Sequence, residues 1–355
     1  MSGLLDGTRV LDAGIWRPVP HATQMLCDLG AEVLKIEPPG GDPMRTFPHI
    51  FRDIAGHKRS VELDLRSEKG HARALELVAH AHVFTEGWRP GVAQRLGLSY
   101  DDVRAVNPSI IYCSISGYGQ DGEFVNLPGH DVCYQALAGA LAPRGDDDWP
   151  SIPRVPIADL AAGTIAALCI CAARVKQVQT GQGEYIDCAM TDVVASWSGP
   201  RTGNVLAGRT QPTRGSAGYG VFRCSDGKFL TLSVISEDHF WDAVCDGLAL
   251  DALRGLGHHE RLDRFEECQG AITDACAALT RDDAVDRLMR AGAPVAPVLT
   301  PDEMASHPHF LEREVVVDAG DGTVRLGFPA RLREHPPRPP GPLPKVGENP
   351  DGWTA

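Results

Sequence analysis

The sequence lacks a long apolar run, is poor in aromatic residues and has fewer positive than negative charges. Aromatic residues make up 6% of the 355 residues, and 34 Lys and Arg stand against 47 Asp and Glu, a formal net charge of -13. This excess of acid excludes a general nucleic-acid or anionic-membrane surface, since both need clustered positive charge. The longest apolar run, 160–173, is interrupted by Gly163 and Thr164 and is shorter than the ~20 residues that cross a bilayer. We therefore expect neither a nucleic-acid nor a membrane partner.

Signals of secretion, disulfide scaffolding and metal binding are also missing. Residues 1–9 contain no basic segment followed by an apolar one, so no secretion signal is expected. Ten cysteines are too dilute for a disulfide framework, and several lie in apolar stretches, among them Cys133 and Cys188. Cys169-x-Cys171 has neither zinc-knuckle spacing nor a second pair nearby. The sequence predicts reduced, buried thiols in a cytoplasmic protein, with no metal site.

Several familiar catalytic motifs are absent as well. The chain contains no G-x-x-x-x-G-K-[ST], no H-E-x-x-H and no G-x-S-x-G. The segment 117–122 does match G-x-G-x-x-G and follows a predicted strand, but Asn126, Pro128 and Gly129 come after it. A dinucleotide fingerprint needs a helix to begin there. We therefore do not expect NAD binding.

The first half of the chain alternates strand-like and helix-like segments. Ala22, Met25 and Leu29 share one helical face, Gly30 ends that helix, and Ser67 is placed to cap another. The predicted strands are 8–12, 31–37, 60–65, 82–86 and 109–115, and the predicted helices are 20–29 and 67–81. This repetition indicates an α/β fold built on a parallel sheet.

The second half has a different texture. A long apolar helix and one further strand come first, then a Gly-, Pro-, Arg- and Thr-rich linker, then a hairpin whose Asp226-Gly227 favours a tight turn. Two amphipathic helices follow, and a proline-rich stretch near the end excludes a regular element. In order, these segments are 160–178, 184–188, 199–220, 219–234, 237–248, 266–289 and 333–344.

Two polar spots stand in otherwise apolar or turn-rich surroundings. One is Pro128-Gly129-His130-Asp131, and the other is Asp159 at the start of the long apolar helix. Taken alone, Asp159 is read most simply as a helix N-cap, and His130 as an ordinary loop histidine. The functional interpretation makes Asp159 a reactive carboxylate beside small residues that let a ligand approach. Spacing does not show whether the two spots are close in space.

Nine segments in a fixed order carry a family resemblance. They include Glu86-Gly-Trp-Arg-Pro-Gly91, Gly129-His130-Asp131 and Ala158-Asp159. The full set is 5–12, 28–39, 56–65, 86–97, 111–122, 129–131, 158–159, 180–187 and 297–301. Together they resemble the class III CoA-transferase (CaiB/BaiF-type) superfamily, which includes the α-methylacyl-CoA racemases.

The resemblance implies an architecture and an oligomer. It implies a large Rossmann-like, CoA-binding α/β domain and a smaller α+β domain, in two chains that interlock as a homodimer. Applied to this sequence, the large domain spans 1–198, a linker 199–218 and the small domain 219–312, and residues 313–355 return to the large domain.

The resemblance also implies two alternative chemistries. In the transferases an aspartate matching Asp159 attacks an acyl-CoA thioester and passes through an aspartyl-CoA thioester. In the racemases a histidine matching His130 and the aspartate matching Asp159 move the proton α to the thioester between two faces. A glutamate of the small domain, matched here by Glu237, pairs with that histidine. Read without the resemblance, Glu237 is an acid in the first turn of a helix.

The CoA moiety would be held by a few placed groups. The candidates are Lys58, Arg59, Arg89 and Asp131, and the alternative for the three basic residues is solvated surface. No cofactor is expected beyond CoA as part of the substrate.

We predict an acyl-CoA-processing enzyme and favour a racemase of 2-methylacyl-CoA thioesters, because His130, Asp159 and Glu237 match together. A CoA-transferase using Asp159 alone is the alternative, and the short segment 214–222 favours it. A catalytically idle acyl-CoA-binding protein is a third interpretation. Spacing does not locate the acyl pocket, so the acyl group stays open.

Overall fold

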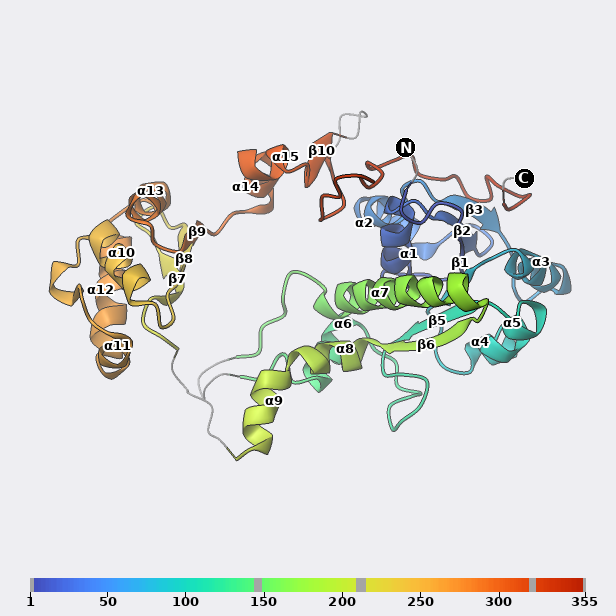
Figure 1. Ribbon diagram of the computed structural model, residues 1–355, viewed down its shortest axis with the longest axis horizontal. Coiled ribbons are helices and arrows are strands. Elements are labelled where there is room, and N and C mark those ends of the chain that lie inside the picture. Colours follow the sequence, from blue (N-terminus) through green and yellow to red (C-terminus); the bar gives the residue numbers. More distant parts are fainter. Residues whose placement is uncertain (1–2, 144–148, 209–214, 319–323, 354–355) are drawn as a thin grey trace. The chain divides into compact units, whose positions relative to one another are not determined.

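The computed structural model describes residues 3–143, 149–208, 215–318 and 324–353 (Figure 1). It divides the chain into two compact units. Unit 1 consists of residues 1–209 together with 308–355, and unit 2 consists of residues 210–307. Unit 2 is thus inserted into the chain of unit 1.

A parallel six-stranded sheet forms the centre of unit 1, in the order β3-β2-β1-β4-β5-β6. Its strands are β1 (Arg9–Asp12), β2 (Glu32–Glu37), β3 (Arg59–Glu62), β4 (Val83–Glu86), β5 (Ile111–Ser116) and β6 (Glu184–Ala189). The sequence predicted all six, and the parallel α/β fold is confirmed. Chain order reverses between β1 and β4, and in such sheets a crevice opens there at the carboxyl ends of the strands.

Helices cover both faces of the sheet because the central strands are apolar on both sides. Every residue of β4 and β5 is buried. Val10 belongs to the core beneath α1 (Pro18–Asp28) and α7 (Ile157–Thr180), and the next residue, Leu11, belongs to the core beneath α3 (Glu68–Ala79) and α5 (Tyr100–Val106). Two apolar layers therefore sandwich the sheet.

Helix α7 is longer than the sequence predicted. Thr164 does not interrupt it, because the Thr164 hydroxyl donates to the carbonyl of Leu160 within the helix. Gly163 does not either: it faces α1, where a Cβ atom would come within 2.7 Å of the Pro18 carbonyl oxygen, so only glycine allows this approach. By length and composition alone, α7 is long and apolar enough to cross a bilayer, which corrects the sequence expectation. A core helix passes the same test, and α7 packs in the core of unit 1.

The remaining elements of unit 1 are short. They are η1 (Pro43–Thr46), α2 (Pro48–Ile54), α4 (Val92–Arg95), α6 (Asp131–Leu137), α8 (Met190–Trp197), α9 (Gly199–Leu206), α15 (Pro308–Glu312), and the antiparallel pair β10 (Val316–Asp318) and β11 (Val324–Leu326). The first part of the predicted linker, 199–218, forms the helix α9. Proline at the second position of α9 is tolerated because that N–H has no intrahelical partner anyway. Residues 209–214 lie outside the described residues.

The C-terminal stretch lies along the edge strand β3 and its neighbours. Asn349 exchanges backbone and side-chain hydrogen bonds with the Ser60 backbone, and the Trp353 indole N–H donates to the Leu77 carbonyl. Arg338 donates to the carbonyls of Gly30 and Ala31. Residues 333–344 form no helix or strand, as their prolines predicted. The stretch satisfies backbone groups that an edge strand would otherwise leave exposed.

Unit 2 has its own core around Trp241, which is fully buried. A three-stranded antiparallel sheet, in the order β7-β8-β9, packs with its helices. The elements are β7 (Tyr219–Arg223), β8 (Phe229–Ser233), α10 (Asp238–Leu248), η2 (Asp251–Leu253), α11 (His258–Asp263), α12 (Phe265–Ala277), α13 (Arg281–Ala291), β9 (Val295–Pro297) and α14 (Pro301–Ser306). The predicted hairpin is confirmed. The predicted helix 266–289 is wrong as one element, because Thr280 ends it by capping α13 through the N–H of Asp283.

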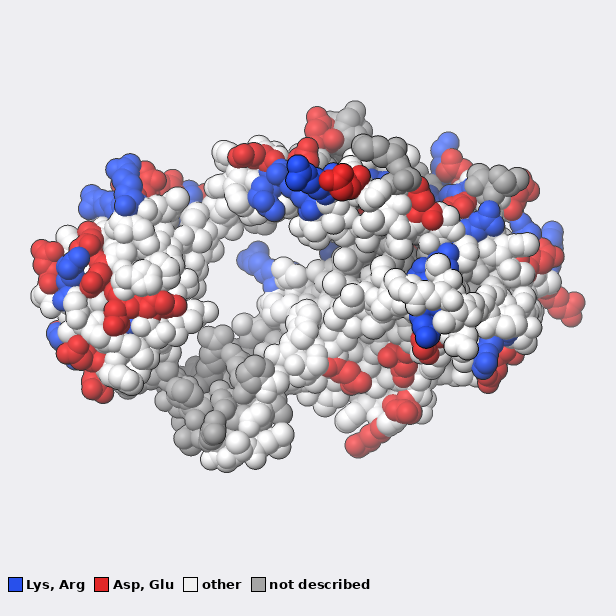
Figure 2. All heavy atoms as spheres, viewed as in Figure 1, with Lys and Arg blue, Asp and Glu red and all other residues white. Residues whose placement is uncertain are grey.

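Acidic and basic side chains are interspersed on the face seen in Figure 2. Neither unit presents a broad basic surface among the residues described there.

A buried ionic network supports the turn between β1 and α1. Lys58 donates to the Asp12 carboxylate at 3.0 Å, to the Thr23 hydroxyl and to the Pro20 carbonyl, and its side chain is fully buried. Burial alone would raise the pKa of Asp12, but the charges of Lys58 and Lys35 hold it below its ordinary value. The second oxygen of Asp12 accepts the N–H of Gly14 and so fixes the start of the turn.

We expect Lys58→Met to destabilise unit 1 strongly, because it removes the only cation that forms an ion pair with the buried Asp12 carboxylate among the described residues and leaves the charge of Lys35, which pairs with Asp42. Losing one partner of a buried pair costs about 3–5 kcal/mol. Urea unfolding monitored by circular dichroism measures the change. The double variant Asp12→Asn/Lys58→Met should recover much of the loss, and Arg290→Ala, which breaks an exposed pair with Asp286, should change stability by less than about 1 kcal/mol. A Lys58→Met protein as stable as the wild type would contradict this account.

Candidate active site

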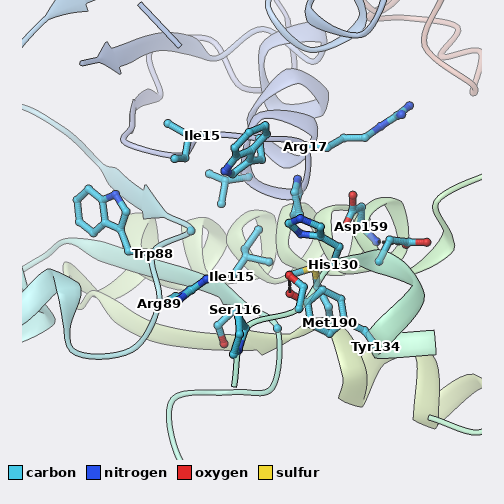
Figure 3. A pocket seen from close by; sticks show the side chains of 18 of the residues that line it. Ile15, Arg17, Trp88, Arg89, Ile115, Ser116, His130, Tyr134, Asp159 and Met190 are labelled. Carbon is cyan, nitrogen blue, oxygen red and sulfur yellow. Dashed lines mark hydrogen bonds between the residues drawn. The ribbon is translucent and has the colours of Figure 1, made fainter. Parts of the chain in front are cut away.

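A cavity of about 580 Å³ opens in unit 1 where the sheet order reverses. The turns that follow β1, β4 and β5 line it, together with the segment before α6 and the start of α7. Most of its wall is apolar or backbone, and the polar side chains that line it include Arg17, Arg89, Ser116, His130, Asp131 and Asp159 (Figure 3). The cavity therefore brings together the two polar spots that the sequence singled out.

One carboxylate joins these two spots. Asp131 opens α6, and its Oδ1 accepts the backbone N–H of Ala158 at 2.7 Å and of Asp159 at 3.1 Å. These N–H groups belong to the first turn of α7, which has no intrahelical acceptor for them. Asp131 thus caps a helix that begins 26 residues after it in the chain. This contact holds His130 and Asp159 in one cavity, which spacing alone did not show.

Asp159 is not the N-cap of α7, contrary to the simplest sequence interpretation. Pro156 occupies the N-cap position, and Asp159 lies in the first turn. Its backbone N–H is held by Asp131, and within the described part of the chain its carboxylate forms no hydrogen bond. The carboxylate is therefore free to react with a ligand in the cavity.

The surroundings of Asp159 shift the pKa of its carboxyl group. Burial raises the pKa of Asp159 to about 6, with a further upward contribution from the Asp131 charge, while Arg17 and His130 act in the opposite direction. At neutral pH the group is mostly ionised, yet it is more basic than a solvated aspartate. A carboxylate of this kind suits either a nucleophile or a base.

The glycine-rich segment 117–122 serves packing and forms no dinucleotide loop. After β5 the chain turns, and no helix begins until Asp131. A Cβ atom on Gly117 would lie 2.5 Å from the ring of Tyr134, and one on Gly129 would lie 2.7 Å from it. The Tyr134 hydroxyl in turn donates to the Gly129 carbonyl. These glycines let the tyrosine form the floor beneath His130.

The turn after β4 carries Trp88 and Arg89 into the cavity wall. The Glu86 carboxylate accepts the N–H of Trp88 at 2.7 Å, and burial raises the pKa of Glu86 to about 7. Arg89 is exposed at the wall, as expected for a residue that would meet a charged part of a ligand. Of the three basic residues proposed for CoA, only Arg89 lines the cavity.

The other two basic candidates lie elsewhere. Lys58 is buried beneath the β1–α1 turn, and its three donors are taken by Asp12, Thr23 and Pro20, which leaves none for a phosphate. Arg59 pairs with Glu32 at 3.1 Å. Neither fits the solvated-surface alternative fully, because the Lys58 side chain is buried and that of Arg59 is 22% exposed.

Glu237 belongs to unit 2, at the N-cap position of α10. Its carboxylate accepts the backbone N–H groups of Ile235 and Ser236. Its pairing with His130 therefore stays a prediction.

Arg17 is a cavity residue that sequence reasoning missed. It follows β1, and its guanidinium lies close enough to lower the pKa of Asp159. Its position just beyond a strand end, at the same sheet edge as Arg89, is the signal that could have found it.

The cysteines and potential metal ligands are scattered. All ten cysteines are free; seven are buried, but Cys133 is exposed and Cys169 and Cys171 are half-buried, so the prediction of buried thiols is wrong for these three. Among the described residues, no group of three His, Cys, Asp or Glu side chains is placed to hold a metal ion.

Comparison with known proteins places the chain among CoA enzymes. The model of CoA-transferase family III matches residues 5–350. An acetyl-CoA:oxalate CoA-transferase of Acetobacter aceti is 31% identical, covering 98% of this chain and 94% of its own. The human alpha-methylacyl-CoA racemase is also 31% identical, over 87% of this chain and 81% of its own. A crystal structure of a CAIB/BAIF family protein from Brucella suis superposes with a TM-score of 0.89 at 28% identity, covering 99% and 98% of the two chains.

We predict that Asp131→Asn lowers the pKa of Asp159 below about 6, since it removes the neighbouring negative charge that helps to raise it. The asparagine oxygen can still accept the two N–H groups of α7, so the fold should persist. Carbon-13 NMR titration of the Asp159 carboxyl measures the shift, with the exposed α5 variant Asp101→Asn as the control. An unchanged midpoint in Asp131→Asn would show that the two carboxylates do not interact.

Proposed function

Because the chain belongs to CoA-transferase family III, we propose that this enzyme moves CoA from an acyl-CoA to a second carboxylic acid, with Asp159 as the nucleophile. The observation that carries the proposal is the Asp159 carboxylate, which faces an apolar cavity without a hydrogen-bond partner among the described residues. A nucleophilic carboxylate needs oxygen lone pairs that accept no hydrogen bond, whereas the oxygens of a structural acid accept hydrogen bonds from neighbouring groups.

The chemistry proceeds in two matched halves. The Asp159 carboxylate attacks the thioester carbonyl, which releases CoA thiolate and forms a mixed anhydride. The thiolate then attacks the aspartyl carbonyl, which releases the first acid and leaves an aspartyl-CoA thioester. The second acid attacks that thioester, and the returning thiolate attacks the acid's own carbonyl, so that the new acyl-CoA leaves and Asp159 is restored. No cofactor beyond CoA as part of the substrate is needed.

Side chains around Asp159 have positioning roles in this scheme. Asp131 holds the backbone of Asp159 through its N–H, which fixes the direction of the nucleophile. Arg89, exposed in the cavity wall, is our candidate for contact with the charged part of CoA. The apolar wall excludes water, which would otherwise hydrolyse the anhydride.

A racemase of 2-methylacyl-CoA thioesters is the second candidate, and a specific observation favours it. His130 and Asp159 line the same cavity and interact electrostatically (Figure 3). Two bases on opposite faces of the α-carbon are the minimum for inversion. In this scheme Glu237 would set the protonation of His130. We rank it second because the relatives include several CoA-transferases, and a transferase needs Asp159 alone.

We expect an aspartyl thioester to form at Asp159 when the protein meets an acyl-CoA. Acetyl-CoA with oxalate, the pair named for the Acetobacter relative, begins the panel, and further acids and acyl-CoAs follow. Hydroxylamine added during turnover should convert the thioester to a hydroxamate, which mass spectrometry locates. Asp159→Asn should form none and lose about 10⁴-fold or more of the activity, with its fold intact because Asp131 still holds its N–H.

His130→Ala separates the two chemistries. A transferase should tolerate it with a mild loss, whereas a two-base racemase should lose ~10²–10⁴-fold. Deuterium incorporation at the α-carbon of a 2-methylacyl-CoA in heavy water, with inversion and without a second acid, would replace the transferase proposal by the racemase. A protein that binds acyl-CoA but catalyses neither reaction would support the idle binder.

We also propose that the enzyme is a cytoplasmic, interlocked homodimer, as the family resemblance implies, without a membrane or nucleic-acid partner. Interlocked chains cannot separate without partial unfolding. Dilution to nanomolar concentration should therefore leave the dimer intact for hours in mass photometry, and mixed tagged and untagged chains should not exchange. Rapid exchange, or a monomer at nanomolar concentration, would rule out interlocking.

A further inference from the structure

Arg17 is a cation in the cavity wall that forms no close ion pair among the described residues, although its charge acts on the Asp53 and Asp159 carboxylates. Its Nε is buried and has no hydrogen-bond acceptor, and within the described ranges no carboxylate pairs with it at 4 Å or less. Burying such a group without a partner is costly. Other arginines of unit 1 have partners, for example Arg45 with Glu37 and Arg59 with Glu32. An unpaired, half-buried arginine in a cavity indicates an anion that arrives from outside.

The position of Arg17 within the cavity indicates which anionic group of the substrates it can contact. In Figure 3, Arg17, His130 and Asp159 gather on one side, and Trp88 and Arg89 lie on the other. The electrostatic effects of Arg17 and His130 on Asp159 agree with this grouping. Arg17 therefore lies on the side of the cavity that carries Asp159, whereas Arg89 lies on the opposite side.

The charge on Asp159 changes during the proposed cycle, and Arg17 experiences that change. In the free enzyme the ionised carboxylate of Asp159 partly balances the guanidinium. Once Asp159 is bound covalently as an aspartyl-CoA thioester, it is neutral, and the Arg17 charge loses one of the two carboxylates that act on it, which leaves Asp53. At that stage the next reactant is itself a carboxylate. A guanidinium binds a carboxylate through two parallel hydrogen bonds and holds it in a fixed direction.

We propose that Arg17 binds the carboxylate of the acid that accepts CoA and directs it onto the Asp159 thioester. This inference rests on the proposed transferase function and adds to it a specificity-determining residue and an order of binding. The acid carboxylate binds well only after Asp159 has lost its charge. One carboxylate oxygen then attacks the aspartyl carbonyl, the C–S bond breaks, and the electron pair leaves with CoA thiolate.

The kinetic test compares the wild type with Arg17→Gln and Arg17→Lys, using the acyl-CoA and acid pair found in the panel above. Arg17→Gln should raise KM for the acid on the order of 10- to 100-fold, since it removes a charge-assisted contact. KM for the acyl-CoA should change less than about 2-fold, and Arg17→Lys should recover part of the loss. Arg104→Gln, an exposed arginine of α5 outside the cavity, is the matched control and should behave as wild type.

A second measurement follows the first half-reaction alone. With acyl-CoA and no second acid, the Arg17→Gln protein at pH 8 should still form the hydroxylamine-sensitive thioester. It should do so more slowly than the wild type, because the first acid leaves as a carboxylate that Arg17 also contacts. At that pH Asp159 is ionised with or without the arginine. Formation of the thioester also shows that the variant is folded.

The outcomes separate the two proposals. If the wild type forms no thioester, the proposed function fails and this inference fails with it. If the wild type forms it, but Arg17→Gln raises KM for the acyl-CoA and leaves KM for the acid unchanged, Arg17 contacts CoA and only this inference is overturned. Complete loss of thioester formation in Arg17→Gln would also overturn it, because Asp159 itself would then depend on Arg17 to react.

Discussion

The cavity depends on carboxylates that accept backbone N–H groups where the chain leaves a strand or begins a helix. Asp12 holds Gly14 after β1, Glu86 holds Trp88 after β4, and Asp131 holds the first turn of α7. Each carboxylate fixes one wall segment of the crevice at the reversal of strand order. These bonds satisfy backbone donors that no regular element satisfies, and they hold the wall segments in place without a ligand.

One of the carboxylates that hold the walls also places negative charge next to Asp159, and this repulsion makes Asp159 more basic. Asp131 stabilises the start of α7, and at the same time its charge raises the pKa of Asp159. A better-solvated aspartate would make the protein more stable and the carboxylate a weaker nucleophile. Next to Arg17, Trp16 has a left-handed backbone with φ of 66°, which is rare for a bulky residue. The strained backbone of Trp16 and the poorly solvated carboxylate of Asp159 therefore lie at the same edge of the sheet.

The fold was largely predictable from sequence, because the strands of the parallel sheet are short apolar runs with clear boundaries. The sequence predictions were wrong where a residue's role depends on a contact with a distant part of the chain. Gly163 was read as an interruption, yet it is the contact between α7 and α1. Lys58 was read as a ligand-binding or surface lysine, yet it lies beneath the sheet edge with Asp12, 46 positions earlier in the chain.

The site was predictable only in part, for the same reason. His130, Asp131 and Asp159 were found as residue types, and the bond that brings them together is a contact between two loops that no periodicity records. Arg17 was missed because a lone arginine after a strand looks like any other. That its Nε has no hydrogen-bond acceptor can be recognised only in the folded structure, where all neighbouring groups are placed.

The insertion of unit 2 into unit 1 has a consequence for the order in which the chain folds during synthesis. All six strands of the parallel sheet lie before residue 190, whereas the outer backbone edge of β3 receives its partner from residue 349, so this edge is covered only after unit 2 has been made. Unit 2 comprises one continuous segment and has its own core, so it can fold while that edge is still uncovered. During that interval the edge of the nascent sheet is unprotected, and it is there that a strand of another chain could pair.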